Sequence, residues 1–526
     1  MSLKVLLVLP IREGSIQIFP DVGLLCLGTV LKNAGHDVTL LDCPKDKTTF
    51  SDFKKLVQDG QFDVVGFRCF SRDHNYVHHH ATIVKTLCPR TLTLVGGPHP
   101  SALPQFVLSR MPNLDFAWKA EAEEGAPALL SLYEEYGLNI PESLLKDIPG
   151  LVWRTKEASH SLQLFSDTQA NKNGIVVNQP GFGIDLDSYI PDWELLKPET
   201  YPNFHQSTKS HSGKIWDGFF HVLTTRGCPY PCTYCNAPNL SGKKLRHRSP
   251  ERVIEELTFL SERYGATRFS IIDDEFTLDK KYAINFCHAM IDSKINMKWD
   301  CPNGVRMDTL YPELLQLMEA AGCDALCVGI ESGNERVQKL IKKKVTVKTI
   351  RERAAMIGNC SNIKITGYFM MGFLDETEEE IKDTIHLACT IPLVRANFNV
   401  VIPIPGVELF QELLDAGRLK LEEINWDTLT NDQVAFKRNH VTGKRLLELQ
   451  REAFLRFYTR PRVAWRVAKE MLQKPKVLLE ILNKLKTLAT RKETYSFSPM
   501  YELQSAAALQ LPGSVSLHPQ SAVADK

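Results

Sequence analysis

The sequence predicts an α/β protein with a doubly wound domain, then a partial barrel of six βα units, and a helical C-terminal region. Three observations predict this architecture. Short apolar runs rich in β-branched residues alternate with helical patterns over residues 1–140, and the alternation returns over residues 216–415. Residues 416–495 are instead helical throughout and basic. The chain has 526 residues, 43% of them hydrophobic and 24% charged, which is globular composition with room for about three domains.

The N-terminal alternation implies a parallel sheet, because each strand is followed by a segment that can return the chain. The ligand crevice of such a sheet lies at the carboxyl ends of its strands. Loops at those ends cover residues 10–13, 69–73, 96–99 and 120–124. The predicted strands are residues 4–9, 37–41, 62–67, 91–95 and 115–118, and the predicted helices are residues 23–34, 74–87 and 123–136.

Two features of this crevice bear on its ligands. Gly96 and Gly97 allow the backbone to approach a flat or phosphorylated ligand, although a tight strand-to-helix turn explains them equally well. The absence of G-x-G-x-x-G and G-x-x-x-x-G-K-[ST] sequences disfavours a nicotinamide or nucleoside triphosphate site. His74 and the histidine run at residues 78–80 suggest metal ligands, but consecutive side chains on a helix point in different directions. We expect a solvated helix surface there.

The strongest signal is a loop with the spacing C-x-x-x-C-x-x-C, formed by Cys228, Cys232 and Cys235 after a strand-like run. Three thiolates in one loop can each ligate one iron of a cubic iron-sulfur cluster, which leaves the fourth iron open. A zinc site or a ferredoxin-like carrier would need a fourth ligand. The candidates are His247, in a basic loop, and Cys287, inside a predicted helix. We therefore favour the three-cysteine cluster.

This loop, with Tyr234 before its last cysteine, resembles the cluster loop of the radical S-adenosylmethionine enzymes. Further motifs of that family follow in order at residues 273–276, 303–308, 328–333, 367–372 and 402–406. The resemblance implies a 4Fe-4S cluster whose open iron binds S-adenosylmethionine.

The resemblance also assigns roles to single residues. Asp273, Asp274 or Glu275 would accept from the methionine ammonium, and Arg306 would pair with the methionine carboxylate. The ribose would bind to Glu331 with Ser332.

Residues 20–42, 96–99 and 119–124 resemble the Rossmann-like cobalamin-binding domain that precedes many radical S-adenosylmethionine enzymes. Gly96, Gly97 and His99 would then contact the corrinoid. Two departures from the family pattern stand out. The usual Gly-Glu-Gly-Glu is replaced within Lys119-Ala120-Glu121-Ala122-Glu123-Glu124, and no D-x-H-x-x-G sequence supplies a lower axial histidine. The second departure implies base-off cobalamin without histidine ligation.

These observations predict five segments. Residues 1–140 form the cobalamin-binding domain, 141–215 a connecting segment with a small hairpin near 148–153, and 216–415 the radical S-adenosylmethionine barrel. Residues 416–495 form a basic helical region, and residues 496–526, rich in Ala, Ser and Pro, a disordered tail. The net charge is +1, but Lys444 to Lys492 contains 14 Lys or Arg and four Glu, a local +10. We expect these helices to cap the barrel, with peripheral membrane contact as the alternative.

The resemblance implies a methyltransferase that cleaves S-adenosylmethionine reductively and uses cobalamin to methylate an unactivated carbon or phosphorus. Cyclisation, oxidation or rearrangement is the second hypothesis, and a non-enzymatic corrinoid or redox sensor is the third. The substrate would be a small molecule, lipid or peptide, the electron donor a flavodoxin or ferredoxin, and no nucleic acid is expected. No apolar run reaches the ~18 residues of a membrane span, and an odd number of cysteines, 13, favours reduced thiols. A cytoplasmic enzyme is therefore expected.

Overall fold

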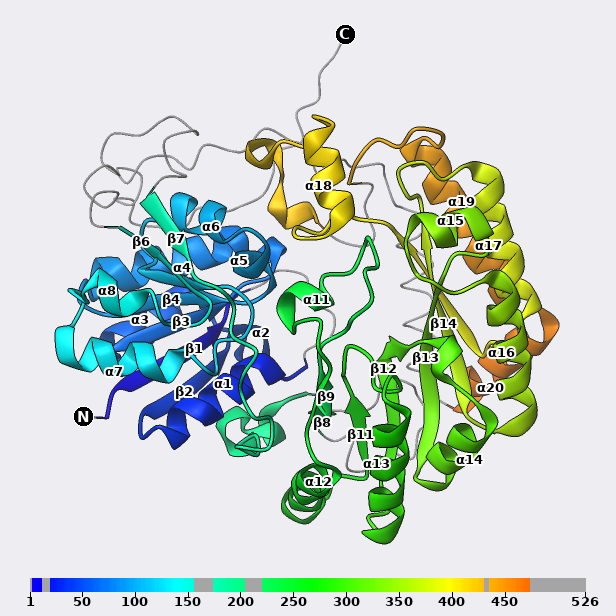
Figure 1. Cartoon of the computed structure of the whole chain (residues 1–526), viewed down its shortest axis with the longest axis horizontal. Coiled ribbons are helices and arrows are strands. Elements are labelled where there is room, and N and C mark those ends of the chain that lie inside the picture. Colours follow the sequence, from blue (N-terminus) through cyan, green and yellow to red (C-terminus); the bar gives the residue numbers. More distant parts are fainter. Residues whose placement is uncertain are drawn as a thin grey trace.

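The computed structural model describes residues 2–11, 19–155, 174–202, 204, 220–429 and 435–473, and all structural statements concern these residues. Two α/β units lie side by side, and each is built on its own sheet (Figure 1). The proposed tail, residues 496–526, and the last part of the basic region lie outside the described residues. No described helix is long and apolar enough to cross a membrane.

The first unit contains a seven-stranded sheet with the order β2-β1-β3-β4-β5-β6-β7. Its first five strands are parallel, as the sequence predicts, and the last two add antiparallel at one edge. The hairpin expected near residues 148–153 is therefore the start of a β6–β7 extension of this sheet. The strands are β1 (Lys4–Leu9), β2 (Asp37–Asp42), β3 (Val64–Arg68), β4 (Leu92–Gly96), β5 (Phe116–Trp118), β6 (Leu151–Arg154) and β7 (Ile175–Val177).

Helices cover both faces of this sheet because alternate strand residues point to opposite sides. Leu6 and Val8 belong to one core, while Val5 and Leu7 belong to the other. Helix α1 begins where the Asp21 side chain accepts from the Leu24 amide, an N-cap contact. The helices are α1 (Val22–Asn33), α2 (Cys43–Asp46), α3 (Phe50–Gly60), α4 (His74–Leu87), α5 (Pro98–Ala102), α6 (Pro104–Arg110), α7 (Ala126–Tyr136) and α8 (Glu142–Leu145).

The strand order reverses between β1 and β3, and such a switch point opens a ligand crevice at the carboxyl ends of the strands. The loops after β3, β4 and β5 meet at this edge. They contain Cys69, Gly97 and Glu121, respectively. The fold therefore brings together three of the four loops that the sequence predicts as one site, and residues 12 and 13 of the fourth lie outside the described residues.

The second unit contains six parallel strands in the order β15-β14-β13-β12-β11-β8. Among the described strands β15 and β8 are the two edges, so the barrel is partial. This confirms the predicted architecture. The strands are β8 (Phe220–Val222), β11 (Arg268–Ile271), β12 (Lys298–Val305), β13 (Cys323–Glu331), β14 (Lys364–Met371) and β15 (Arg395–Val400). The helices of this unit are α11 (Ala237–Leu240), α12 (Pro250–Tyr264), α13 (Lys280–Asp292), α14 (Pro312–Ala320), α15 (Glu335–Leu340), α16 (Val347–Cys360) and α17 (Glu378–Thr390).

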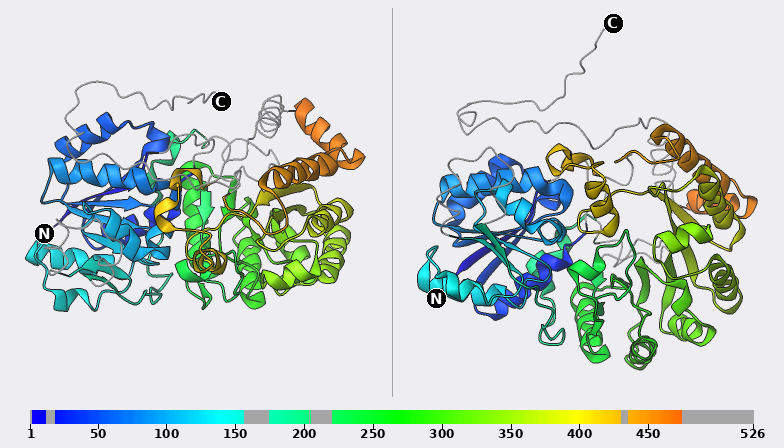
Figure 2. Two further views of the ribbon diagram at one scale, coloured as in Figure 1. Left: turned by 90° about the horizontal axis from the view of Figure 1, so that it is seen from above. Right: turned by 45° about the horizontal axis from the view of Figure 1, so that its top comes forward.

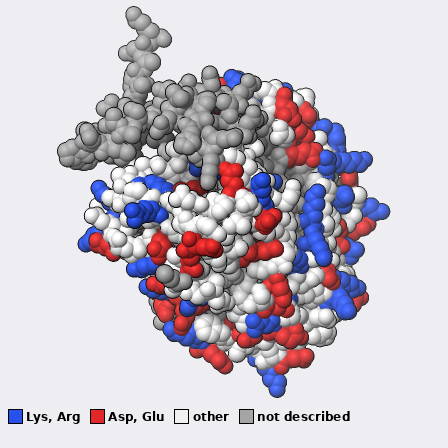
Figure 3. Space-filling view, turned by 60° about the vertical axis from the view of Figure 1, so that its left-hand side comes forward, with Lys and Arg blue, Asp and Glu red and all other residues white. Residues whose placement is uncertain are grey.

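The described part of the C-terminal region packs part of its apolar stripe on the barrel. Helix α19 (Gly443–Tyr458) packs on β15 and α17 and buries Leu446, Leu449 and Phe457 (Figure 2). Helix α20 (Pro461–Gln473) follows, and α18 (Glu408–Asp415) lies between the two units (Figure 1). Positive and negative side chains are interspersed over the face shown in Figure 3, in keeping with the net charge of +1.

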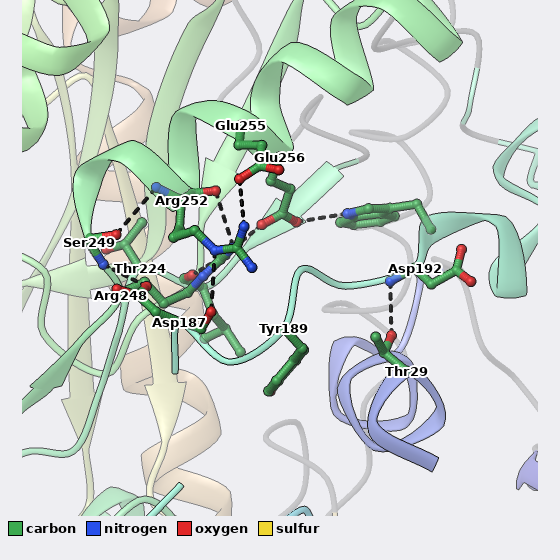
Figure 4. Close-up of polar contacts among 12 residues, drawn as sticks. Thr29, Asp187, Tyr189, Asp192, Thr224, Arg248, Ser249, Arg252, Glu255 and Glu256 are labelled. Atoms are coloured by element: carbon green, nitrogen blue, oxygen red, sulfur yellow. Dashed lines mark hydrogen bonds and ion pairs between the residues drawn. The ribbon is translucent and has the colours of Figure 1, made fainter. Parts of the chain in front are cut away.

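A linker at residues 185–193 touches both units (Figure 4). The Asp192 amide donates to Thr29 Oγ1 of α1 at 2.8 Å. On the other side, the Ser249 amide donates to Asp187 Oδ1 at 2.8 Å, and Trp193 Nε1 donates to Glu256 Oε1 of α12 at 2.7 Å. The linker therefore fastens the two units to each other.

Candidate functional site

The cysteine loop begins at the last residue of β9 (Thr225–Arg226) and is held by β10 (Arg246–His247). Gly227 has φ +102°, and a Cβ there would clash with the Lys244 carbonyl, so the turn into the loop requires glycine. The Cys228 amide donates to the Gly242 carbonyl at 3.0 Å. The backbone around the first thiol is thus fixed by the loop that precedes β10.

The chemistry of the three thiols fits an iron-sulfur cluster. Cys228, Cys232 and Cys235 are free and partly buried. Burial raises the pKa of Cys228 and raises that of Cys235 to about 11, with smaller contributions from the acidic Asp274 and the neighbouring thiols. The thiolates of Cys228 and Cys235 therefore need the positive charge that metal ions supply.

The three cysteines are candidate ligands for three irons of one cube rather than for a single ion with four ligands. Among the described residues, no group of three or more His, Cys, Asp or Glu side chains, the three cysteines included, is placed to hold a single metal ion. A cube presents separate irons to its three thiolates. The fourth zinc ligand considered above, His247, lies 3.4 Å from Asp279 and packs on Tyr282.

The acidic residues after β11 differ in their accessibility. Asp273 is buried and accepts from Thr224 and Thr225, and its burial raises its pKa to about 6. Glu275 is also buried; it accepts from Thr277 and from the Arg306 amide, and burial raises its pKa to about 7. Asp274 is partly exposed and accepts from the Gly227 amide at 3.3 Å.

Arg306 lies against the cluster loop. Its guanidinium carbon is 3.7 Å from the centroid of the Tyr230 ring. The same group donates to both Asp308 carboxylate oxygens and to the Lys343 carbonyl. The guanidinium is thus fixed beside the cysteine loop before any ligand binds.

Glu331 ends β13 in a strained backbone conformation, with φ +64°. Its Oε1 accepts from Tyr234 OH and from Lys343 Nζ, both at 3.1 Å. Ser332 is fully buried, shares a hydrogen bond with Thr384 and accepts from the Asn334 amide. Glu331 and Tyr234 are therefore joined directly, and Ser332 lies in the packing behind them.

Lys343 is a site residue that sequence reasoning missed. Its ammonium donates to Glu331 and Tyr234, and the residue as a whole is 9% exposed. Burial lowers the pKa of Lys343, but Glu331 and the Cys232 thiol outweigh burial and raise it, so the group stays charged. The only sequence signal was a run of three lysines at residues 342–344, which normally indicates a solvated surface.

Gly96 and Gly97, at the carboxyl edge of the first sheet, differ in the space that surrounds them. Gly96 is partly exposed, and the nearest atom to a Cβ placed there is Trp118 Cβ at 3.9 Å. Gly97 has φ +110°, and its Cβ would lie 2.9 Å from the Cys69 carbonyl oxygen. A side chain at Gly96 would thus have open space, whereas Gly97 is required by packing inside the protein.

The prediction that His74 and His80 lie on a solvated helix surface is wrong, because both side chains are buried. His74 Nδ1 lies 3.0 Å from His99 Nε2, and His99 Nδ1 lies 3.1 Å from Ser71 Oγ. Burial lowers the pKa of His74 to about 3 and that of His99 well below its usual value, so both rings are neutral. Trp426 packs against them from the C-terminal region, with its ring centroid 4.7 Å from that of His99.

Comparisons with known proteins agree with this division of the chain. The model of the B12 binding domain matches residues 15–130, and that of the radical SAM superfamily matches residues 222–388. An uncharacterised methyltransferase of Pyrococcus horikoshii is 29% identical over 471 residues, which cover 88% of this chain and 94% of the relative.

Two further matches have more specific names. The cytidylyl-2-hydroxyethylphosphonate methyltransferase of Streptomyces wedmorensis is 27% identical over 442 residues, covering 76% of this chain and 79% of that enzyme. The structure of the radical S-adenosylmethionine methyltransferase TsrM from Kitasatospora setae, with cobalamin and a [4Fe-4S] cluster bound, matches with a TM-score of 0.62. It is 17% identical and covers 80% of this chain and 77% of TsrM, so this likeness concerns the fold.

Proposed function

The chain belongs to the cobalamin-dependent radical S-adenosylmethionine enzymes, and we propose that it methylates an unactivated carbon or phosphorus of a small-molecule, lipid or peptide substrate. Its cofactors are a 4Fe-4S cluster, S-adenosylmethionine and cobalamin. When bound, the cluster supplies the electron that cleaves S-adenosylmethionine, and cobalamin supplies the capacity to carry a methyl group. The observation that supports the proposal is that the crevice of the first sheet and the cysteine loop are in direct contact, through Arg226.

We assign the three cysteines as cluster ligands. Asp274 is our choice for the methionine ammonium, because the side chains of Asp273 and Glu275 accept from protein donors in buried positions. Arg306 and Lys343 would supply positive charge for the methionine carboxylate.

The ribose we assign to Glu331, with Ser332 supporting its backbone turn. Gly96 and Gly97 would form the corrinoid-binding edge. His99 would shape that loop through its hydrogen bonds to His74 and Ser71 rather than ligate cobalt.

The experiment that tests the proposal uses protein loaded with cluster and cobalamin under anaerobic conditions, a low-potential reductant and S-adenosylmethionine labelled in its methyl group. Fractions of cell extract are screened for those that stimulate 5′-deoxyadenosine release. Label in the product supports methyl transfer. Release of 5′-deoxyadenosine without label in the product would instead indicate cyclisation, oxidation or rearrangement, and the absence of release with any fraction would favour a sensor.

The reaction needs an electron donor, and we propose a flavodoxin or ferredoxin for this role. We also propose that the protein works in a reducing cytoplasm. All thirteen cysteines are free, as such a setting implies. The C-terminal region we propose as a cap only. Binding to anionic vesicles that weakens with added salt, and that is lost when Arg462 and Lys469 are changed to Glu, would contradict this and favour a lipid substrate.

A further inference from the structure

Two carboxylates from the edge of the first sheet reach the strand that leads into the cysteine loop. Glu121 and Glu123 follow β5 and are 9% and 7% exposed. The Arg226 guanidinium lies 2.9 Å from Glu123 Oε1 and 3.4 Å from Glu121 Oε2. Arg226 is the last residue of β9, two positions before Cys228. The contact therefore joins the predicted corrinoid edge to the cluster loop itself.

A second arginine completes the network. Arg246 lies opposite Arg226 in the β9–β10 register and donates through both terminal nitrogens to the Glu121 carboxylate. Arg226 also donates to Tyr189 OH of the linker at 3.1 Å. Two carboxylates and two guanidinium groups thus balance in charge at a buried site, which such groups require.

Hydrogen bonds extend this network to the glycine loop. The Ala120 amide donates to Ser101 Oγ at 2.9 Å, and Ser101 Oγ donates to the Gly97 carbonyl at 2.7 Å. Ala120 has φ +67°, a conformation that a residue with a side chain rarely adopts. Strain of this kind persists only where surrounding contacts enforce it. A continuous series of contacts therefore connects Gly97 to Arg226.

We propose that Glu121, Glu123, Arg226 and Arg246, which we call the carboxylate bridge, are positioning residues that set the distance and orientation between the corrinoid site and the cluster. The inference rests on the proposed function in one respect, namely that both cofactors serve one reaction. Buried ion pairs add little net stability compared with apolar packing, so a role in defining one arrangement accounts for this bridge better. A displacement of about 1 Å can lower a rate about 100-fold, so two cofactors in one reaction need such definition.

The linker holds the two units together independently of the carboxylate bridge. Asp187 and Asp192 fasten the two units to each other at contacts separate from the carboxylate bridge (Figure 4). A variant that weakens the bridge should therefore keep both units folded and joined. Only the position of the cysteine loop relative to the corrinoid edge should change.

The experiment measures the distance between the two cofactors in protein loaded with cluster and cobalamin and reduced so that both cobalt and cluster are paramagnetic. Pulsed electron paramagnetic resonance should give one narrow distance distribution for the natural protein. Two variants, Glu123→Gln and Glu121→Gln, remove the charge but keep the size of the side chain. Each should broaden or shift this distance distribution. Once a substrate is known, methyl transfer per S-adenosylmethionine cleaved should fall about 10–100-fold in these variants.

Asp300→Asn is the matched control. Asp300 is fully buried and lies 3.2 Å from Arg268, but inside the barrel and away from the bridge. This variant should lose stability and keep the natural distance distribution. If Glu123→Gln and Glu121→Gln also keep the natural distance distribution, the bridge serves stability alone and the proposal is wrong.

A milder variant covers the case in which those two fail to fold. Glu123→Asp keeps the charge and shortens the side chain by one methylene, and it must still shift the distribution; an unchanged distance would overturn the proposal. Because the measurement needs no turnover, it gives an answer even if methyl transfer is never observed.

Discussion

The Lys343 ammonium lies 3.1 Å from Glu331 Oε1 in the barrel, and this pair joins β13 to the cysteine loop through Tyr234. The pair combines a strained backbone, an ion pair and a tyrosine hydroxyl at one point. Such strain and buried charge typically gather at functional sites. We therefore expect this pair to affect ligand binding more than folding.

Lys343→Gln should weaken S-adenosylmethionine binding to the cluster-loaded protein by about 10–100-fold, because it removes a buried cation beside the cysteine loop. Lys344→Gln, an exposed neighbour, is the control and should bind normally. Isothermal titration calorimetry under anaerobic conditions measures the affinity of both variants for S-adenosylmethionine. Equal affinities for the two variants would remove Lys343 from the site.

Replacing any one of Cys228, Cys232 and Cys235 with Ala should abolish the iron-sulfur absorbance and 5′-deoxyadenosine formation. Cys287→Ala should leave both unchanged, since that thiol is fully buried in the barrel core. Iron and sulfide analysis after anaerobic reconstitution provides the measurement. Retention of the cluster by Cys232→Ala would mean that the ligands are assigned wrongly.

Gly96→Val should lower cobalamin uptake while the fold is retained, because its side chain would enter the open space at the crevice. Gly97→Val should instead destabilise the first unit by about 2 kcal/mol or more, through positive φ and the clash with Cys69. Thermal unfolding and corrinoid absorbance separate the two effects. Normal cobalamin uptake by a folded Gly96→Val protein would leave that edge without a ligand role.

Ala120→Gly should stabilise the protein by about 1 kcal/mol, since glycine adopts φ +67° without steric cost. The entropy that glycine adds to the unfolded chain reduces this gain. Denaturant unfolding of the apoprotein measures the difference. A loss of stability would show that the Ala120 methyl group contributes packing that outweighs the strain.

Glu376→Gln should flatten the dependence of stability on pH. Burial raises the pKa of Glu376 to about 7, against partial stabilisation of its charge by the Gly372 and Phe373 amides. Because the folded state holds this proton more tightly than the unfolded chain, the carboxyl contributes stability below about pH 4.5 that is lost as the pH rises through about 7.

Between these pH values the contribution of the Glu376 carboxyl to the free energy of unfolding should fall by about 3 kcal/mol. Glutamine accepts the same two amide hydrogen bonds at every pH, so at pH 8 the variant should be the more stable protein. Urea unfolding at pH 5 and pH 8 tests this, and parallel curves for the two proteins would contradict it.

The sequence predicted both sheets, and it predicted that the cysteine loop follows a strand, because these signals are local. Strand periodicity, the cysteine spacing and the glycine pair each lie within a few residues. The burial of His74 could not be predicted in this way, because it depends on contacts with His99 and with Trp426, some 350 residues away. Lys343 was missed for the same reason: a lysine run indicates solvent unless the fold supplies a buried carboxylate.

The backbone at Ala120 is a second kind of feature that sequence patterns do not reveal. In the sequence, the usual Gly-Glu-Gly-Glu is replaced within residues 119–124. The structure shows that Ala120 adopts a positive φ, which glycine favours, and that Glu121 and Glu123 have arginine partners across the interface. Ala120 therefore occupies a backbone conformation that suits glycine, at a cost that residue propensity alone does not reveal.

The distribution of the cysteines has a practical consequence for handling. Seven of the thirteen are buried: Cys26, Cys43, Cys69, Cys287, Cys301, Cys323 and Cys327. Burial raises the pKa of six of these thiols, which makes them poor targets for alkylating agents and for dissolved oxygen. Exposure to air should therefore strip the cluster and oxidise the accessible thiols while the two cores remain chemically intact. Material purified aerobically then becomes a usable starting stock, because adding thiol, iron and sulfide restores the missing component without a refolding step.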